Sequence, residues 1–200
     1  MDKIKLVAIF RGIRPAEAAE HIATLVGEGF RYIEIPLNSP DWRQSIPQMV
    51  ARFGEQAVIG AGTVLKVEQV DFLADAGAKL IVTPNTQPEV IRRAVARGMR
   101  VCAGCATATE AFSALDAGAQ WLKIFPSSAF GPDYIRALKA VLPPEVPVLA
   151  VGGVTPENLA SWVRAGCAGA GLGSDLYRAG QAVERTRQQA ERFIAAARCG

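Results

Sequence analysis

The chain has 200 residues, half of them hydrophobic, and its 22 basic and 19 acidic side chains give a net charge of +3. A chain of this length buries a full hydrophobic core, so we expect a single domain over residues 1–200. The basic residues form no cluster, which argues against a nucleic-acid partner.

The cysteines and the first apolar stretch indicate the compartment. Four cysteines are scattered along the chain, as in proteins of a reducing compartment. The apolar stretch near the start is short and is interrupted by Arg11, which fits neither a signal peptide nor a membrane span. We therefore expect a cytoplasmic protein without a membrane partner.

Short apolar runs alternate with helix-like segments along the chain, in the pattern of βα units. The predicted strands are residues 6–11, 32–37, 58–64, 80–84, 100–105, 121–126, 146–151 and 168–173. Helix starts are predicted at Pro15, Pro88, Pro132 and Thr155-Pro156-Glu157, helix ends at Gly29, Gly77, Gly98, Gly118 and Gly166, and a last helix over residues 181–197. Eight such units predict a (β/α)8 TIM barrel with an eight-stranded parallel sheet. The alternative, a doubly wound open sheet, lacks its Gly-x-Gly-x-x-Gly fingerprint after the first strand.

Side-chain alternation places three charged residues inside this predicted barrel. Ile33 and Ile35 suit packing against helices, so Glu34 between them points inward. The same alternation puts Lys123 and Arg11 inside. Barrel interiors are normally apolar, and active sites lie where the strands end. The three charges therefore predict an active site.

Lys123 is the candidate nucleophile. Its apolar neighbours predict burial, which disfavours the ammonium form and lowers the pKa of the amine. A neutral amine can form a Schiff base with a ketone. Two alternatives remain open: the lysine head reaches water while its stem is buried, or Glu34 serves only as its ion-pair partner.

Other catalytic chemistries find little support. The single histidine, His21, lies in a predicted helix, and we interpret it as a helix-surface residue outside any catalytic triad. Cys102 and Cys105 lie three apart on a predicted strand, where they point to opposite faces and cannot share a metal. We expect chemistry without a metal and without histidine.

Two glycine-containing loops predict a phosphate site. Gly152 and Gly153 follow the seventh predicted strand, and Gly173 and Ser174 follow the eighth. Barrels often bind phosphate with the loops after these two strands, through backbone N–H groups. The hydroxyl of Ser174 offers a further donor.

With these residues in view, the chain resembles the KDPG/KHG aldolase family, the class I aldolases of 2-keto-3-deoxy sugar acids. The matching segments are residues 10–12, 34–39, 60–65, 82–85, Lys123 with Pro126, residues 151–156 and residues 171–174. The resemblance covers essentially the whole chain. It is closest to the branch that acts on 2-dehydro-3-deoxy-6-phosphogalactonate, through residues 34–40 and 123–132.

The resemblance implies a role for each matching residue. It implies that Lys123 forms the Schiff base and that Glu34 is the general acid/base. It implies substrate binding by Arg11, Thr63, Pro84 and Val151, and phosphate binding by Gly152, Gly153, Gly173 and Ser174. It also implies a homotrimer that binds a phosphorylated 2-keto-3-deoxy sugar acid and pyruvate and that needs no metal or cofactor.

Two positions depart from the branch that cleaves the gluconate epimer, KDPG. Asn38 stands in place of an arginine, which leaves carboxylate binding to Arg11, and Val151 stands in place of a threonine. Both differences favour the galactonate epimer, although one hydrogen bond discriminates modestly. The alternatives are KDPG cleavage, a sugar-phosphate epimerase or isomerase, and a phosphosugar sensor without turnover.

Overall fold

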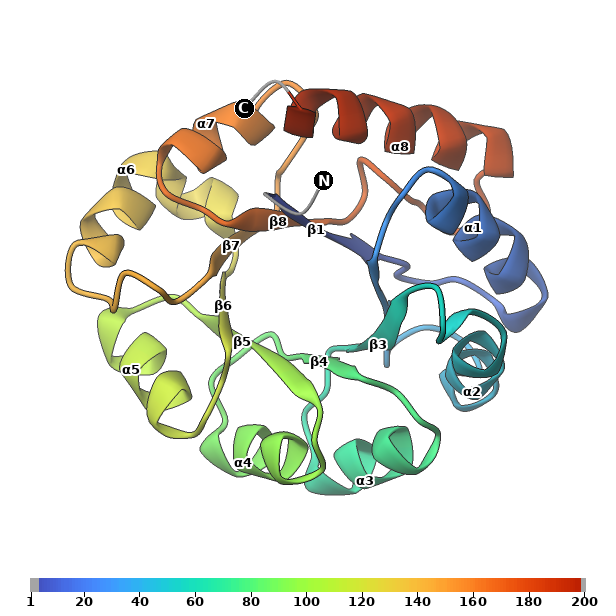
Figure 1. Ribbon diagram of the computed structural model, residues 1–200, viewed down its shortest axis with the longest axis horizontal. Helices are drawn as coiled ribbons and strands as arrows, with labels where there is room; N and C mark the ends of the chain where they lie inside the picture. Colours follow the sequence, from blue (N-terminus) through green and yellow to red (C-terminus); the bar gives the residue numbers. More distant parts are fainter. Residues whose placement is uncertain (1–3, 199–200) are drawn as a thin grey trace.

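The computed structural model describes residues 4–198, which form a closed barrel of parallel strands surrounded by helices (Figure 1). The strands are β1 (Lys5–Ile9), β2 (Tyr32–Pro36), β3 (Val58–Gly62), β4 (Leu80–Val82), β5 (Arg100–Cys105), β6 (Trp121–Ile124), β7 (Val148–Val151) and β8 (Gly169–Leu172). The helices are α1 (Pro15–Gly27), α2 (Trp42–Phe53), α3 (Val67–Asp75), α4 (Pro88–Ala96), α5 (Ala108–Asp116), α6 (Ser127–Lys139), α7 (Leu159–Arg164) and α8 (Val183–Arg198). Each strand pairs with the next along the chain and β8 pairs with β1, so the predicted (β/α)8 barrel is confirmed.

The strands are shorter than predicted at their C-terminal ends. Six of the eight end one or two residues early, because ladder pairing stops where the chain turns into the βα loops. Arg11, Thr63 and Pro84 therefore lie in loops just beyond β1, β3 and β4, where the strand ends open toward solvent.

Two predicted helix starts are wrong. Helix α6 begins at Ser127 and is kinked at Gly131 (φ 79°), so Pro132 opens only its second part. Helix α7 begins at Leu159, because the preceding segment forms a turn in which the Thr155 N–H donates to Asn158 Oδ1 at 2.9 Å. The starts at Pro15 and Pro88 are confirmed.

The predicted helix ends are also confirmed. The five glycines after α1, α3, α4, α5 and α7 all have positive φ values, between 72° and 101°. This conformation is strained for residues with a Cβ atom, so glycine ends the helix and turns the chain toward the next strand. The last helix, α8, spans residues 183–198 instead of 181–197.

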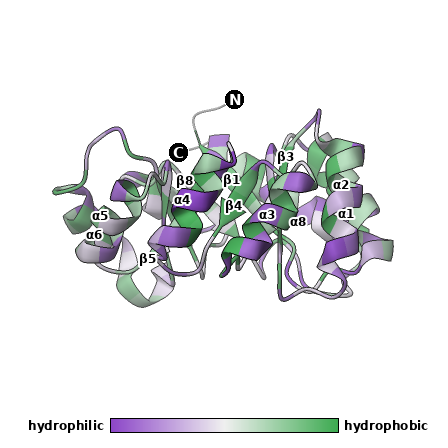
Figure 2. Ribbon diagram, turned by 90° about the horizontal axis from the view of Figure 1, so that it is seen from below, coloured by the Kyte–Doolittle hydropathy of each residue, from purple (hydrophilic) through white to green (hydrophobic). Residues whose placement is uncertain are grey.

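The strands separate two hydrophobic clusters. The inner cluster fills the barrel and consists of Val7, Ile9, Leu80, Val82, Cys102, Trp121, Leu149 and Val151. The outer cluster joins the other strand faces to the helices and includes Ile33, Ile35, Leu122 and Ile124. This division agrees with the alternation that points Glu34 and Lys123 inward. Figure 2 shows hydrophobic strands at the centre and hydrophilic residues on parts of the surrounding helices.

His21 is not on the surface as predicted. Its side chain is 2% exposed and points from α1 toward α8, where its Nδ1 is 2.8 Å from Thr186 Oγ1. The ring also makes an edge contact with Tyr177, with 5.0 Å between the centroids. Helix α8 covers α1 in the closed barrel, so tertiary packing buries a residue that periodicity alone leaves exposed.

Across the described part of the chain, the helices are too short or too polar to cross a membrane.

Candidate active site

A cavity of about 590 Å³ opens at the C-terminal ends of the strands. Its lining combines residues from six of the βα units: Ile9, Arg11, Thr63, Pro84, Lys123, Phe125, Val151, Gly152, Gly153, Val154, Gly173, Ser174, Asp175, Tyr177 and Arg178. Nine of the ten predicted site residues lie in this lining. The tenth, Glu34, is buried deeper in the barrel and is 2% exposed.

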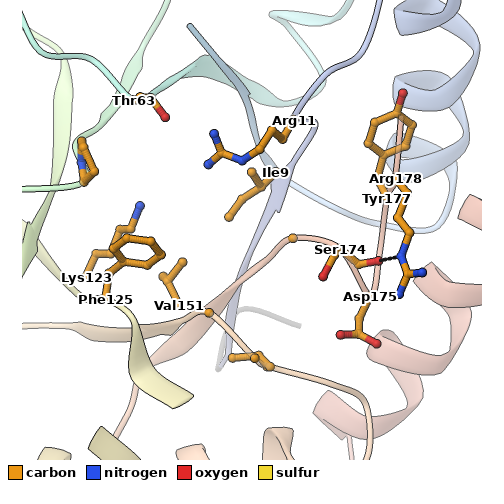
Figure 3. Close-up of a pocket in the computed structure, with 15 residues that line it drawn as sticks. Ile9, Arg11, Thr63, Lys123, Phe125, Val151, Ser174, Asp175, Tyr177 and Arg178 are labelled. Carbon is orange, nitrogen blue, oxygen red and sulfur yellow. Dashed lines mark hydrogen bonds between the residues drawn. The ribbon is translucent and has the colours of Figure 1, made fainter. Parts of the chain in front are cut away.

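Lys123 lies on β6 and is 5% exposed. Its strand neighbour on β5 is Gly104, which brings no side chain beside the lysine stem. In Figure 3 its amine points into the cavity, and Nζ is 4.8 Å from the centroid of the Phe125 ring. Burial lowers the pKa of the amine; the carboxylate of Glu34 opposes this shift, and the positive charge of Arg11 lowers the pKa by a smaller amount. The amine is therefore nucleophilic closer to neutral pH than an exposed lysine.

Glu34 lies on β2 with its carboxyl group inside the barrel. Burial raises its pKa to about 7, although Lys123 and Arg11 oppose the shift. Its Oε2 atom is buried and has no hydrogen-bond partner among the described residues. A carboxyl group with this pKa exchanges protons readily near neutral pH, as a general acid/base must.

Lys123 and Glu34 influence each other without forming an ion pair. Every ion pair within residues 4–198 is made by an arginine, and none joins these two groups. The carboxyl group therefore does not compensate the lysine charge by direct contact. This geometry disfavours the alternative in which Glu34 only stabilises a protonated lysine.

Arg11 faces Lys123 across the cavity (Figure 3). It follows β1 and is exposed at the cavity mouth. Its Nη1 donates to Asn38 Oδ1, in the loop after β2, at 2.7 Å. The guanidinium makes this end of the cavity cationic, which suits an anionic ligand.

Thr63 and Pro84 form the wall above β3 and β4. Thr63 has a φ of 54°, which is unusual for a β-branched residue, and such backbone strain concentrates at functional sites. Pro84 is preceded by Thr83, whose buried Oγ1 donates to Asn85 O and accepts from the Gly104 N–H. These bonds hold the loop after β4 against β5, beside Lys123.

The two predicted glycine loops lie together at the opposite side of the cavity. Gly152 and Gly153 both have positive φ values, and Asn158 Nδ2 donates to Gly153 O at 2.8 Å, which fixes this loop. Ser174 turns its hydroxyl toward the cavity in Figure 3. Its backbone oxygen accepts a hydrogen bond from Arg178 Nε at 3.0 Å, so a second arginine borders the cavity on this side.

The sequence reasoning missed two residues that shape the site. Ser127 is fully buried; its Oγ donates to Ile124 O at 2.7 Å and accepts from the Val151 N–H at 3.0 Å, which joins the ends of β6 and β7. Gly62 provides the space that the Glu34 carboxyl group occupies. The alternate glycines in Gly60-Ala61-Gly62, on a predicted strand beside Glu34, are a signal for such close approach. No comparable signal distinguishes Ser127.

Six further lining residues were not predicted as site residues: Ile9, Phe125, Val154, Asp175, Tyr177 and Arg178. The last three follow β8 and extend the cavity beyond the glycine loop. The inward direction of Ile9 follows from the same alternation that places Glu34.

Cys102, Cys105 and Cys167, the cysteines among residues 4–198, do not line the cavity. Cys102 belongs to the inner cluster and Cys105 to the outer one, which confirms that they point to opposite faces of β5. Burial raises the pKa of Cys102 to about 12, so its thiol stays protonated. Within residues 4–198, no three His, Cys, Asp or Glu side chains lie close enough together to hold a metal ion.

Known proteins are similar to this chain in sequence and in fold. The chain matches the family described as KDPG and KHG aldolase over residues 1–192, and it belongs to that family. It is 69% identical over 196 residues to 2-dehydro-3-deoxy-6-phosphogalactonate aldolase of Escherichia coli (strain K12), covering 98% of this chain and 96% of that protein.

Two solved structures are similar throughout. One, described as native KDPGal, has a TM-score of 0.97 and 68% identity, covering 99% of this chain and 96% of that chain. The other is a cube-shaped protein cage designed by fusing symmetric oligomeric domains. It has a TM-score of 0.97 and 69% identity over 98% of this chain and 73% of that chain.

Proposed function

We propose that this protein is a class I aldolase that cleaves 2-dehydro-3-deoxy-6-phosphogalactonate to pyruvate and D-glyceraldehyde 3-phosphate, in the catabolism of galactonate. The observation that carries the reaction class is the buried amine of Lys123, with its lowered pKa, in a cavity above the raised-pKa carboxyl group of Glu34. The choice of substrate follows the name of the 69% identical Escherichia coli protein.

Lys123 provides the electron sink. Its neutral Nζ attacks the C2 ketone of the sugar acid, and the carbinolamine loses water to form a protonated imine. When the C3–C4 bond breaks, its electron pair moves toward this cation and forms an enamine instead of a free carbanion. The apolar neighbours Phe125 and Val151 limit the access of water to the imine.

Glu34 moves the protons. Its carboxylate accepts the proton of the C4 hydroxyl group, directly or through one water molecule, as D-glyceraldehyde 3-phosphate leaves. The resulting carboxylic acid then protonates the enamine at C3, and hydrolysis of the imine frees pyruvate and Lys123. A group with a pKa of about 7 performs both steps at neutral pH with little bias toward either form.

The two ends of the substrate bind at opposite sides of the cavity. The C1 carboxylate contacts Arg11, and Thr63 and Pro84 line the path between Arg11 and Lys123. The 6-phosphate binds at Gly152, Gly153, Gly173 and Ser174 through backbone N–H groups and the serine hydroxyl. Remote phosphate binding orients C2 toward Lys123, so a substrate without phosphate should lose much of its kcat/KM.

The first test is imine trapping. Incubation with pyruvate and borohydride should attach a reduced pyruvate adduct to Lys123, identified by peptide mass spectrometry, and Lys123→Ala should abolish it. A sugar-phosphate epimerase or isomerase that uses Lys123 only as a charged group would give no adduct. A phosphosugar sensor would bind the sugar phosphate but release no pyruvate in an assay coupled to lactate dehydrogenase.

The second test is substrate preference. We expect a higher kcat/KM for the galactonate 6-phosphate than for its C4 epimer, KDPG, when the two are compared side by side. A marked preference for KDPG would overturn the substrate assignment and leave the aldolase reaction standing.

We also propose that the protein is a cytoplasmic homotrimer of single-domain subunits that span residues 1–200. Phe112 on α5 and Phe130 on α6 are 40% and 38% exposed, so the barrel has apolar surface available for subunit contacts. The use of a 69% identical chain in a cage built from symmetric oligomeric domains supports an oligomer. Light scattering coupled to gel filtration should give three times the 21.2 kDa subunit mass; a monomer or dimer mass would contradict the trimer.

A further inference from the structure

The loop after β2 makes three hydrogen bonds to Arg11 and its two neighbours in the chain. Asn38 Oδ1 accepts from Arg11 Nη1 at 2.7 Å. The side chain of Ser39, which is 5% exposed, contacts the backbone on both sides of Arg11: its Oγ accepts from the Gly12 N–H at 2.9 Å and donates to Phe10 O at 3.4 Å. One dipeptide therefore fixes both the backbone and the side chain of a cavity-lining arginine.

Arg11 is held without being neutralised. Of the described carboxylates, none forms an ion pair with Arg11, and its only side-chain hydrogen bond goes to a neutral amide. A guanidinium has five N–H donors in a planar fork, so one bond to Asn38 leaves donors free for a bidentate contact with a carboxylate. An acidic residue at position 38 would instead compete with the ligand for the same charge.

We propose that Asn38 and Ser39 are positioning residues that orient Arg11 as the carboxylate-binding group of the cavity, an inference that rests on the proposed aldolase function. Neither residue lines the cavity, so both act through Arg11. The backbone beside Arg11 is also bonded to the backbone of Glu34, since the Phe10 N–H donates to Glu34 O at 3.0 Å. The proposed carboxylate-binding residue and the proposed general acid/base are therefore held by adjacent strands.

The orientation of Arg11 also matters for the reacting groups. Its positive charge lowers the pKa of both Lys123 and Glu34. If the guanidinium swings away from Lys123, the ammonium form of the lysine becomes more favourable. Loss of the Asn38 contact should therefore shift the acidic limb of the kcat/KM profile to higher pH, in addition to weakening carboxylate binding.

A double-mutant cycle tests the proposal on the full-length enzyme. Asn38→Ala should raise KM about tenfold, the expected loss for one hydrogen bond to a charged group, with kcat within about threefold of the parent. Asn38→Asp should raise KM at least as much, because the new carboxylate would form an ion pair with the Arg11 guanidinium and compete with the substrate carboxylate. In an Arg11→Ala background, Asn38→Ala should have no further effect, since the group on which it acts is gone.

Ser39 and a control complete the experiment. Ser39→Ala should raise KM in the same direction, and Ser39→Thr, which keeps the hydroxyl group, should recover part of the loss. Gln44→Ala, an exposed amide on α2 that follows the same loop, should leave KM unchanged. Thermal unfolding of each variant separates lost positioning from lost stability.

The outcomes separate the two proposals. If the parent enzyme forms no pyruvate adduct with borohydride, the proposed function fails. If the adduct forms, but Asn38→Ala leaves KM unchanged or keeps its full effect in the Arg11→Ala background, the positioning role is overturned and the aldolase function stands.

Discussion

The carboxyl group of Glu34 on β2 occupies the space that a side chain at Gly62 on β3 would fill. A Cβ atom at position 62 would lie 1.8 Å from Glu34 Oε2 and 2.4 Å from Cδ. Glu34 pairs with Gly60 in the strand register, and Gly62 lies one inward position further along β3. The glycine therefore decides where the proposed general acid/base, Glu34, can lie inside the barrel.

Gly62→Ala should displace this carboxyl group. We expect kcat/KM to fall about 10²–10⁴-fold, the usual contribution of a positioned general acid/base. The melting temperature should also fall, because the methyl group and the carboxyl group cannot share the space. Adding Glu34→Ala should restore much of the melting temperature without restoring activity.

The control for this substitution is Gly27→Ala in α1, where an added Cβ meets no atom within 4 Å. It should leave activity unchanged and should not lower the melting temperature. Parental activity in Gly62→Ala would contradict the role given to Glu34.

Glu34→Gln should change stability in a pH-dependent way. The native carboxyl group has a pKa of about 7, raised from 4.5, so the native state binds more protons than the unfolded state between these pH values. The contribution of this group to stability is therefore present below about pH 4.5 and is lost as the pH rises to 7. At pH 8 the parent has lost about 3 kcal/mol of unfolding free energy relative to low pH. The neutral glutamine does not titrate and so avoids this loss.

The measurement is urea unfolding of the parent and of Glu34→Gln at pH 5 and pH 8. The variant should be more stable than the parent at pH 8 by about 1–3 kcal/mol, with a clearly smaller difference at pH 5. Glu145→Gln, in an exposed loop, should show the same difference at both pH values. A Glu34→Gln variant that is less stable than the parent at pH 8 would contradict the raised pKa.

Ser127→Ala should weaken the junction between β6 and β7. It leaves the buried Ile124 O and Val151 N–H without their partner, a loss of about 1–3 kcal/mol in unfolding free energy. Because this junction positions both Lys123 and Val151, kcat/KM should fall as well. Ser113→Ala on α5 is the matched control. Equal stability of the two variants would show that the Ser127 bonds contribute little.

Val151→Thr tests epimer discrimination. Val151 is 5% exposed and lines the cavity, so a hydroxyl group there would face the substrate. We expect the ratio of kcat/KM for KDPG to that for the galactonate epimer to rise about tenfold, the effect of one added hydrogen bond. An unchanged ratio would remove Val151 from the specificity determinants.

Local sequence was sufficient to predict the barrel and to predict that Glu34 and Lys123 point into it. Periodic apolar runs define β2 and β6, and strict alternation then leaves Glu34 and Lys123 only the inner face. The pattern did not locate the strand ends well, since Arg11 and Thr63 continue the apparent pattern after ladder pairing has stopped. It also misplaced His21, because the contact between α1 and α8 forms only when the barrel closes.

The amino-acid sequence by itself determined the order of the elements, the closed parallel architecture and the inward direction of Glu34 and Lys123, because hydrophobic periodicity is a property of each short segment. Tertiary structure alone decided which residues contact Arg11, Val151 and Glu34. Each of these contacts joins residues 24 or more positions apart: Asn38 with Arg11, Ser39 with Gly12, Ser127 with Val151, and Glu34 with Gly62. Contacts at such separations depend on strand register and loop closure, which local propensity does not encode.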